Sequence, residues 1–452
     1  MKVHFIAIGG SAMHNLAIAL HKKGITVTGS DDEIFEPSNS RLAKYGLLPQ
    51  KIGWDKNNIN ESVEAVILGM HARNDNPELL EAQRLGIKIF SYPEYLYEQS
   101  KDKTRVVIGG SHGKTTITAM ILHVLNALNI ECDYMVGAQL EGFDVMVKLT
   151  DTSKIMILEG DEYLTSPIDR RPKFHLYMPN IALISGIAWD HINVFPTFVN
   201  YIDQFKIFID LISEGGSLVY CEDDENVKKI AVESQKNIKK FGYTFPEHKI
   251  IDGTTIIKND GKEIPISVFG KHNLANMNGA RLVCNQLEVN DADFFEAIKS
   301  FSGASKRLEL VKKNSKTALY KDFAHSPSKL TATIKAVKEQ FPNSKLFACM
   351  ELHTFSSLNK EFLEHYHGCM EAADVAIVYF SPHTIELKKL PPISVEEVKS
   401  AFGGNNIKVY TNSNDLLSDL LKENWENKNL LMMSSGNFDG IDFKELANQI
   451  IN

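Results

Sequence analysis

Short apolar runs alternate with segments of helical periodicity along most of the chain. The first such unit comprises a strand predicted over residues 3–8, a glycine turn at 9–11, a helix over 13–22 and a second strand over 25–28. Apolar strands separated by amphipathic helices are typical of βαβ units, whose strands run parallel. The N-terminal region is therefore predicted to be a parallel α/β domain.

The alternation continues and is interrupted at two polar segments, which are residues 98–103 and 301–306. Before the first segment we predict strands over 65–68 and 88–90 and a helix over 77–85. Between the two segments we predict strands over 105–108, 155–158 and 181–187 and helices over 117–128 and 201–211. After the second segment we predict strands over 317–320, 345–350, 375–379, 407–410 and 429–433.

The polar segments are candidate boundaries of three α/β domains with mostly parallel sheets. We predict a Rossmann-like domain over residues 1–100, a central domain with a P-loop ATPase-like sheet over 101–303, and a Rossmann-like C-terminal domain over 304–452. The length of 452 residues fits this number, since domains hold roughly 150 residues each.

Composition narrows the class of protein. There are 49 Lys and Arg and 57 Asp and Glu residues, and the net charge of −8 argues against a general nucleic-acid or acidic-membrane binder. The five cysteines form no C-x-x-C pair, which indicates a reducing compartment without structural zinc. The N-terminal apolar run is too short for a signal peptide, and no run reaches 18 apolar residues. We expect a cytoplasmic monomer.

The strongest chemical signal is a glycine-rich loop between a predicted strand and a predicted helix. Amides of such a loop at a helix N-terminus attract phosphate oxygens, a lysine reaches the β- and γ-phosphates, and a hydroxyl ligates Mg²⁺. The loop is shorter than the strict G-x-x-x-x-G-K-[ST] form, and an accidental turn is the alternative. The candidate ATP-binding residues are Gly110, Ser111, His112, Gly113, Lys114, Thr115 and Thr116.

Two further strand ends offer metal ligands. Glu159 follows an apolar run, and carboxylates at the carboxyl edge of a parallel strand point into the ligand crevice. Mg²⁺ prefers such oxygen ligands. His191 follows the next predicted strand and could reach the same crevice. The alternatives are a solvated acidic turn and a structural histidine.

The first glycine turn is a weaker phosphate signal. It precedes a helix, but Ala7 and Ala12 occupy two glycine positions of the dinucleotide fingerprint. Asp31 ends the second strand, where an acidic residue can bind a ribose. Both a dinucleotide site and a plain structural turn remain open.

Three other segments carry candidate nucleotide contacts. Asn273 and Asn276 open a helical stretch and either bind adenine or cap the helix. Arg307 could neutralise a γ-phosphate, and Asp322 and His325 could close over the nucleotide. Ordinary surface charge is the alternative for these last three residues.

Six of these pieces, in this order, resemble the Mur ligase family, which includes folylpolyglutamate synthetases. The matching motifs are GSHGKTT, EGDE, the Asp-His pair at 190–191, HNLAN, SKR and DFAHSP. The resemblance implies ATP-driven amide formation by three domains that bind a UDP-sugar, ATP and the incoming amine.

The resemblance also implies roles for single residues. The catalytic group comprises Lys114, Glu159, His191 and Arg307; Mg²⁺ is held by Thr115, Glu159 and His191, and by Lys206 only if this lysine is carbamylated. ATP is additionally bound by Asn273, Asn276, Asp322 and His325. The UDP-sugar is bound by Gly9, Gly10, Ser11, Ala12, Met13, Ser30 and Asp31.

Within the family, Ile8-Gly9-Gly10 resembles the branch that acts directly on UDP-N-acetylmuramate. Residues 30–37, 162–163, 169–179 and 433–441 favour joining the tripeptide L-alanyl-γ-D-glutamyl-meso-diaminopimelate, as in peptidoglycan recycling, and joining free L-alanine is the alternative. The competing classes are a nicotinamide-dependent dehydrogenase, which does not explain the separate phosphate loop with its carboxylate and histidine, and a regulatory P-loop switch without amide chemistry.

Overall fold

The computed structural model describes residues 1–70, 72–137, 145–189, 194–259, 261–301, 303, 308–403 and 407–451. The chain forms two compact units, Met1–Thr244 with Ala275–Ile298, and Phe245–Leu274 with Lys299–Asn452. The predicted α/β class is confirmed. The division into three domains at residues 100 and 303 stays a prediction, because the first unit contains two sheets.

The N-terminal sheet of the first unit is wholly parallel, with strand order β2-β1-β3-β4. Its strands are β1 (Lys2–Ile6), β2 (Thr26–Ser30), β3 (Ala65–Leu68) and β4 (Lys88–Ser91), and its helices are α1 (Ser11–Lys22), α2 (Ser38–Lys44), α3 (Pro77–Arg84) and α4 (Tyr92–Ser100). The strand predicted to reach residue 8 ends at Ile6. Ala7 has a left-handed φ of 67°, and the amides of Ala7 and Ile8 both donate to the Ser30 carbonyl.

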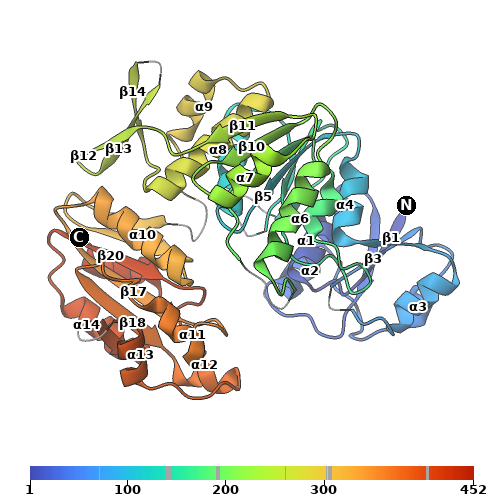
Figure 1. Ribbon diagram of the computed structural model, residues 1–452. Coiled ribbons are helices and arrows are strands. Elements are labelled where there is room, and N and C mark those ends of the chain that lie inside the picture. The colour runs from blue at the N-terminus through green and yellow to red at the C-terminus, as the bar shows by residue number, and fades with distance from the viewer. Residues whose placement is uncertain are drawn as a thin grey trace. The chain divides into compact units, whose positions relative to one another are not determined.

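The second sheet of this unit has the order β11-β10-β9-β5-β8-β6-β7 and is parallel except for β7. Its strands are β5 (Thr104–Gly109), β6 (Asp133–Met135), β7 (Val147–Lys148), β8 (Ile155–Glu159), β9 (Ile181–Ile184), β10 (Ser217–Cys221) and β11 (Lys239–Tyr243). Its helices are α5 (Lys114–Ala127), α6 (Phe198–Asp210), α7 (Glu225–Glu233), α8 (Lys271–Gln286, whose first turn belongs to the other unit) and α9 (Asp291–Ile298) (Figure 1). The middle of the central strand β5, residues 106–108, is apolar and buried, as expected for a strand covered on both faces.

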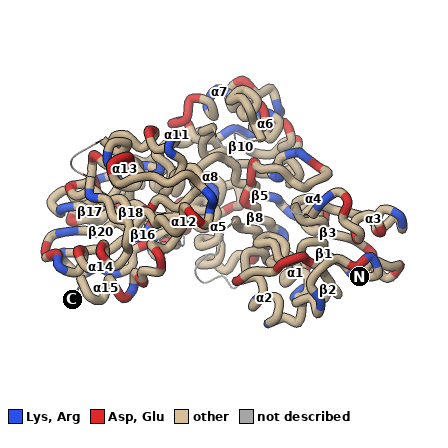
Figure 2. Tube along the Cα trace, turned by 90° about the horizontal axis from the view of Figure 1, so that it is seen from below, with Lys and Arg blue, Asp and Glu red and all other residues tan. Residues whose placement is uncertain are grey.

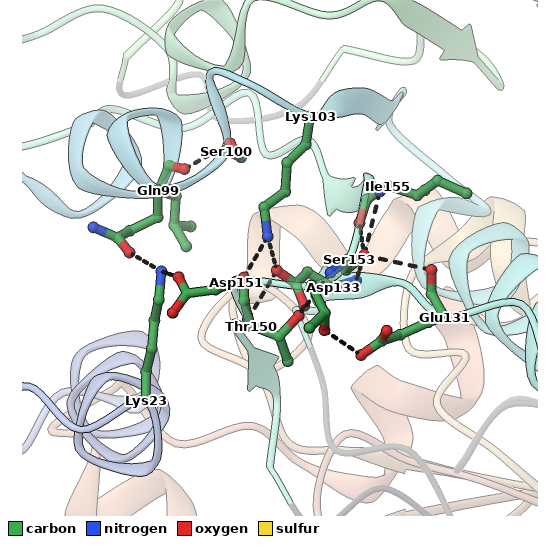
Figure 3. A network of polar contacts seen from close by, with 12 residues as sticks. Lys23, Gln99, Ser100, Lys103, Glu131, Asp133, Thr150, Asp151, Ser153 and Ile155 are labelled. Carbon is green, nitrogen blue, oxygen red and sulfur yellow. Dashed lines mark hydrogen bonds and ion pairs between the residues drawn. The ribbon is translucent and has the colours of Figure 1, made fainter.

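The predicted linker 98–103 is the end of α4 followed by a turn, and polar side chains fix it. Lys103 Nζ pairs with the buried carboxylate of Asp133 and donates to the Thr150 carbonyl at 2.6 Å (Figure 3). Lys23, just after α1, reaches Gln99 Oε1 at 2.9 Å and Asp151 Oδ1 at 2.9 Å. The Lys23–Asp151 ion pair therefore links the N-terminal sheet region to the second sheet region, and Lys103 fixes the turn to β6.

The buried Arg105 guanidinium also holds this turn. It donates to the carbonyls of Ser100, Lys101 and Lys103 at 2.8–3.0 Å and to two carbonyls near residue 178 at 3.0 Å. The last carbonyls of a helix have no intrahelical partner, and Arg105 supplies donors to those at the end of α4. These hydrogen bonds therefore fix the position at which β5 begins.

The second unit contains two sheets. The first is antiparallel, with β12 (His248–Ile251), β13 (Thr254–Asn259) and β14 (Lys262–Ile266), and the sequence analysis did not predict it. The second has the order β15-β16-β20-β17-β18-β19, with strands β15 (Glu309–Lys313), β16 (Ala318–Asp322), β17 (Lys345–Leu352), β18 (Val375–Phe380), β19 (Ile407–Tyr410) and β20 (Lys428–Met433). Only β15 in this sheet is antiparallel.

Helices cover both faces of the six-stranded sheet (Figure 1). They are α10 (Pro327–Gln340), α11 (Lys360–Leu363), α12 (Pro382–Leu387), α13 (Val395–Ala401), α14 (Ser413–Lys422) and α15 (Phe443–Ile450). Alternate residues of β17 enter separate cores: Ala348 and Met350 pack with α10 and α13, whereas Cys349 packs with α14 and α15. The two-residue period of a strand thus produces a core on each face.

Surface properties agree with the composition. Basic and acidic residues are mixed along the described chain in the view of Figure 2. All five cysteines are free thiols. Within the described ranges, no helix has the length and apolar character needed to cross a membrane.

Candidate active site

The carboxyl ends of three adjacent strands bring the central motifs together. Strand β5 lies between β8 and β9, and Ile108 is level with Glu159 on one side and with Leu183 on the other. The glycine-rich loop after β5 and the acidic turn after β8 therefore leave the sheet at the same edge. This is the edge at which parallel α/β sheets bind ligands.

The loop depends on its two glycines. Gly110 has φ 126° and Gly113 has φ 77°, backbone conformations that other residues rarely adopt. Gly113 is the N-cap of α5, and a Cβ added there would meet the side chain of Asn276, with Cγ only 3.1 Å away. The Ser111 amide donates to the Gly186 carbonyl at 2.9 Å, which ties the loop to the segment after β9.

Lys114 is the first residue of α5, and its side chain is largely buried. Its Nζ donates to the Gly110 carbonyl at 2.6 Å and to Glu162 Oε2 at 2.8 Å. Burial alone would lower the pKa of Lys114, but the carboxylates of Glu162, Asp161 and Glu159 outweigh it and hold the pKa above the ordinary lysine value. The loop therefore presents a permanent ammonium group beside its backbone amides.

Thr115 and Glu159 bring a hydroxyl and a carboxylate into contact beside this lysine. Thr115 Oγ1 donates to Glu159 Oε1 at 2.8 Å, and the Gly137 amide donates to Glu159 Oε2 at 2.9 Å. A hydroxyl and a carboxylate in contact at a phosphate loop fit the oxygen preference of Mg²⁺. Their role as metal ligands stays a prediction, and His191, the third predicted ligand, lies outside the described residues.

Glu162 and Asp161 extend the acidic turn into a second layer of contacts. Glu162 Oε1 accepts from the Tyr201 hydroxyl at 3.0 Å, and this hydroxyl is 2.9 Å from Ser111 Oγ. Asp161 pairs with Lys173 at 2.6 Å. Burial would raise the pKa of Asp161, but Lys173 and then Lys114 lower it below the ordinary value. Sequence reasoning did not assign Glu162, Tyr201 or Lys173.

The sequence pointed to these three residues to different degrees. Glu162 belongs to the quoted EGDE motif and was adjacent to a predicted ligand, so its position was accessible. Tyr201 is one of several aromatic residues on the apolar face of α6, and nothing in its local sequence separates it from core residues. Lys173 lies in a 3₁₀ turn, Lys173–Tyr177, and is distinguished only by its partner.

The predicted adenine and closure residues are distributed over both units. Asn276 lies against the phosphate loop in the first unit. Asn273 belongs to the second unit, where its amide donates to the Phe269 carbonyl at 3.3 Å. Asp322, also in the second unit, accepts from the Ala324 amide at 2.6 Å and from the Leu308 amide. His325 Nδ1 is 2.8 Å from the Phe323 carbonyl. Arg307 lies outside the described residues.

Lys206 shows the environment of an ordinary surface lysine. It lies on α6 with about half of its side chain exposed, at 51 %, and its Nζ donates to Asp203 Oδ1 at 2.9 Å. This contact favours an unmodified, positively charged Lys206 over a carbamate, because the negative charge of a carbamate would repel Asp203. Its conditional place among the metal ligands stays a prediction.

The loop predicted to bind the UDP-sugar is held by a hydrogen bond to the Asp31 side chain. The Gly9 amide donates to Asp31 Oδ2 at 2.6 Å, and a Cβ on Gly9 would lie 2.9 Å from the same oxygen. Burial raises the pKa of Asp31, while the Gly9 amide acts in the opposite direction. Gly10 is the N-cap of α1, which begins at Ser11 rather than at Met13 as predicted, so Ser11, Ala12 and Met13 form its first turn. Asp31 thus shapes the loop.

A buried cluster supports the end of β2 beside this loop. Ser30 Oγ donates to Glu78, which also accepts from the Asp55 amide at 3.0 Å and Asn58 Nδ2 at 2.9 Å. His4 Nε2 lies 3.3 Å from the same carboxylate. Burial would raise the pKa of Glu78, but these hydrogen bonds, that of His4 first, lower it. Sequence reasoning predicted Ser30 but not its partner.

Comparisons with known proteins agree with the motifs. Residues 2–104 match the model of the "Mur ligase family, catalytic domain", and residues 108–284 match the "Mur ligase middle domain". The chain is 31% identical to UDP-N-acetylmuramate–L-alanine ligase of Sulfurihydrogenibium sp. over 83% of this chain and 82% of that protein. It is 33% identical to the ligase of the same name from Caldicellulosiruptor bescii, with 83% of each covered.

Solved structures share the fold. A murein peptide ligase from Psychrobacter arcticus covers 100% of this chain and 99% of its own, with TM-score 0.64 and 21% identity. UDP-N-acetylmuramate–alanine ligase of Thermotoga maritima covers 97% and 96%, with TM-score 0.69 and 21% identity. The chain belongs to the Mur ligase family. It is accordingly an ATP-dependent ligase that forms amide bonds.

Proposed function

We propose that this ligase joins the lactyl carboxylate of UDP-N-acetylmuramate to the α-amine of L-alanyl-γ-D-glutamyl-meso-diaminopimelate, as in peptidoglycan recycling. The observation that carries the ATP chemistry is the Lys114 ammonium inside a glycine-rich loop, next to the Thr115–Glu159 pair. A cytoplasmic, monomeric enzyme remains the accompanying expectation.

The chemistry must convert a poor acyl donor into a good one. A carboxylate cannot expel oxide, so ATP transfers its γ-phosphoryl group to the lactyl carboxylate and phosphate becomes the leaving group. The amine then attacks the acyl phosphate, and amide, ADP and phosphate result. For such phosphoryl transfers the protein supplies mainly positioning and charge neutralisation.

This chain's residues have defined parts in that scheme. Lys114 and the loop amides neutralise the β- and γ-phosphates, because they form one cationic, donor-rich surface at the start of α5. Thr115 and Glu159, with His191, would hold Mg²⁺. When bound, Mg²⁺ neutralises phosphate charge and polarises the phosphoryl oxygen. Arg307, Asn273, Asn276, Asp322 and His325 remain predicted ATP contacts.

The N-terminal turn is proposed to bind the UDP-sugar. The first turn of α1 offers the amides of Ser11, Ala12 and Met13 at a helix N-terminus, which favours the diphosphate. Asp31 holds the turn through Gly9, and Glu78 holds the preceding Ser30. Both acidic residues therefore support the shape of the site.

The amine site is proposed at the carboxyl ends of β17 and β20 in the second unit. Met350 pairs with Met433, so residues after both strands meet at one edge. The buried Glu351 accepts from Ser434 Oγ and from the Phe438 amide at 2.9 Å, and His353 Nδ1 lies 3.5 Å from its carboxylate. The His353 ring, the Ser434 hydroxyl and Asn437 therefore lie at the loop after β20, which Glu351 holds in place. Together with His325 and Lys329 of the same unit, they suit a long ligand that carries carboxylates.

Joining free L-alanine is the second candidate function. The two relatives reported above bear the name UDP-N-acetylmuramate–L-alanine ligase, at 31% and 33% identity. The two functions share the acyl-phosphate chemistry and differ only in the amine. The tripeptide is favoured because residues 169–179 and 433–441 resemble the ligases that use it.

An amine panel decides between the two. Purified enzyme receives ATP, Mg²⁺ and UDP-N-acetylmuramate with either L-alanine or the tripeptide, and kcat/KM is measured from ADP release. We expect tripeptide to exceed alanine by at least tenfold; equal or better use of alanine would assign the biosynthetic reaction. Lys114→Ala should lower turnover on the preferred amine by about 10²–10³-fold. Activity within a few-fold of the parent would refute the phosphate-loop assignment.

A further inference from the structure

A buried tyrosine connects three elements around the phosphate loop. Tyr201 lies on α6 with no exposed surface, at 0 %, and its hydroxyl contacts Ser111 Oγ at 2.9 Å and Glu162 Oε1 at 3.0 Å. Glu162 Oε2 holds Lys114 Nζ at 2.8 Å, and the Ala188 amide donates to Ser111 Oγ at 2.9 Å. One phenol oxygen therefore lies between the loop, the acidic turn and the segment after β9.

The direction of this chain of hydrogen bonds follows from counting protons. The Glu162 carboxylate of the ion pair can only accept, so the single proton of the Tyr201 hydroxyl goes to Glu162. The Ser111 hydroxyl must then donate to Tyr201, and Ser111 Oγ accepts from the Ala188 amide. In these contacts the Ser111 hydroxyl donates to Tyr201, Tyr201 donates to Glu162, and Glu162 holds Lys114.

We infer that Tyr201 is a positioning residue whose hydroxyl keeps Glu162 hydrogen-bonded when Lys114 turns from Glu162 to the phosphates of ATP. This inference rests on the proposed role of Lys114. Lys114 donates to Glu162 and to the Gly110 carbonyl, so phosphate must compete with these acceptors for it. Glu162 is only 2 % exposed, and a buried carboxylate that loses its cation is costly.

Tyr201 reduces that cost because its hydrogen bond to Glu162 does not depend on Lys114. A hydrogen bond to a charged group is strong, and its value rises when the other partner leaves. Removing the hydroxyl should therefore weaken the state in which Lys114 binds phosphate more than the ligand-free state. The predicted consequence is a loss of nucleotide affinity, with little effect on the UDP-sugar site.

The position allows a clean substitution. The Tyr201 ring packs against Phe195 and Phe205 with centroid distances of 5.3 Å, and Tyr201→Phe retains these contacts. Tyr177→Phe is the matched control, because the Tyr177 hydroxyl is buried in the same unit without a hydrogen-bond partner among the described residues. Its removal should cost nothing.

The experiment measures the Kd of Mg-ATP by calorimetry, KM for UDP-N-acetylmuramate, and the thermal midpoint of full-length enzyme. We expect Tyr201→Phe to raise the Kd of Mg-ATP by about tenfold, with the KM for the UDP-sugar within twofold of the parent. Tyr177→Phe should stay within twofold in both. A lowered thermal midpoint with an unchanged Kd would assign Tyr201 to packing alone and overturn the inference.

A double-mutant cycle tests the route through Glu162. Glu162→Gln removes the buried charge, so Tyr201→Phe added to it should change the Kd less than twofold. A full tenfold effect in that background would overturn the inference. Lys114→Ala separates the two levels: if it weakens Mg-ATP binding while Tyr201→Phe matches Tyr177→Phe, only the inference fails. If Lys114→Ala leaves binding unchanged, the proposed phosphate site fails as well.

Discussion

Gly113→Ala tests whether the phosphate loop depends on a left-handed residue pressed against Asn276. Gly113 has φ 77°, and an alanine in this region costs about 1–2 kcal/mol. The new Cβ would also lie 3.1 Å from Asn276 Cγ and closer still to its Oδ1. Because that amide ends a side chain that can rotate, the steric part should add about 1 kcal/mol. The expected total is about 2–3 kcal/mol.

Two companion variants separate these parts. Gly215 has φ 72° in the same unit and nothing within 4 Å of an added Cβ, so Gly215→Ala should show the backbone cost alone. Asn276→Ala in the Gly113→Ala background should recover the steric part. Thermal unfolding without nucleotide provides the measurement; each kcal/mol corresponds to about 2–4 °C for a domain of this size.

The outcome also bears on function. Gly113 is the N-cap of α5 and precedes Lys114, so displacement of the backbone should weaken Mg-ATP binding in Gly113→Ala but not in Gly215→Ala. The reasoning is refuted if the two glycine variants are equally stable, or if Asn276→Ala restores nothing. Either result would mean that the contact with Asn276 does not constrain the loop.

Two further predictions concern side chains outside this loop. Because the hydrogen bonds of Glu78 lower its pKa in the folded state, the stability that Glu78→Gln removes should be fully present above about pH 4.5 and should decrease as the pH falls through the folded pKa. Urea unfolding of both proteins between pH 7 and pH 3.5 measures this, and a difference that grows on acidification would contradict it. Lys206→Ala should retain parental activity with or without bicarbonate, because Lys206 pairs with Asp203 at the surface. If removal of bicarbonate lowers the activity of the parent but not that of the variant, Lys206 is carbamylated.

The sequence by itself determined the local units of this protein. The strand predicted over residues 65–68 matches β3, and the glycine-rich loop lies between β5 and α5 as predicted, although α5 begins at Lys114 rather than at residue 117. Periodicity and glycine positions are local properties, so they fix a strand, a turn and a helix without knowledge of the rest of the chain. The order of motifs along the chain was enough to indicate the family, which the comparisons confirmed.

Strand order was decided only by the tertiary structure. Glu159 reaches Thr115 because β8 pairs with β5, although β6 and β7 come between them in the chain. Neither the antiparallel sheet of β12, β13 and β14 nor the antiparallel strand β15 was predicted from the sequence. Pairing partners depend on contacts between distant segments, which the period of a single segment does not encode.

The same holds for the charges around Lys114. Glu162 lies 48 residues away in sequence and Tyr201 lies 90 residues from Ser111, yet these side chains form one connected group. The local sequence identified Lys114 by its place after a glycine-rich loop. In α6 the local sequence shows only an apolar face, which does not distinguish Tyr201 from core residues. An unpaired charge or hydroxyl is costly when it is buried, so buried groups of this kind need partners. The partners come from distant parts of the chain, and only the tertiary structure shows which residues they are.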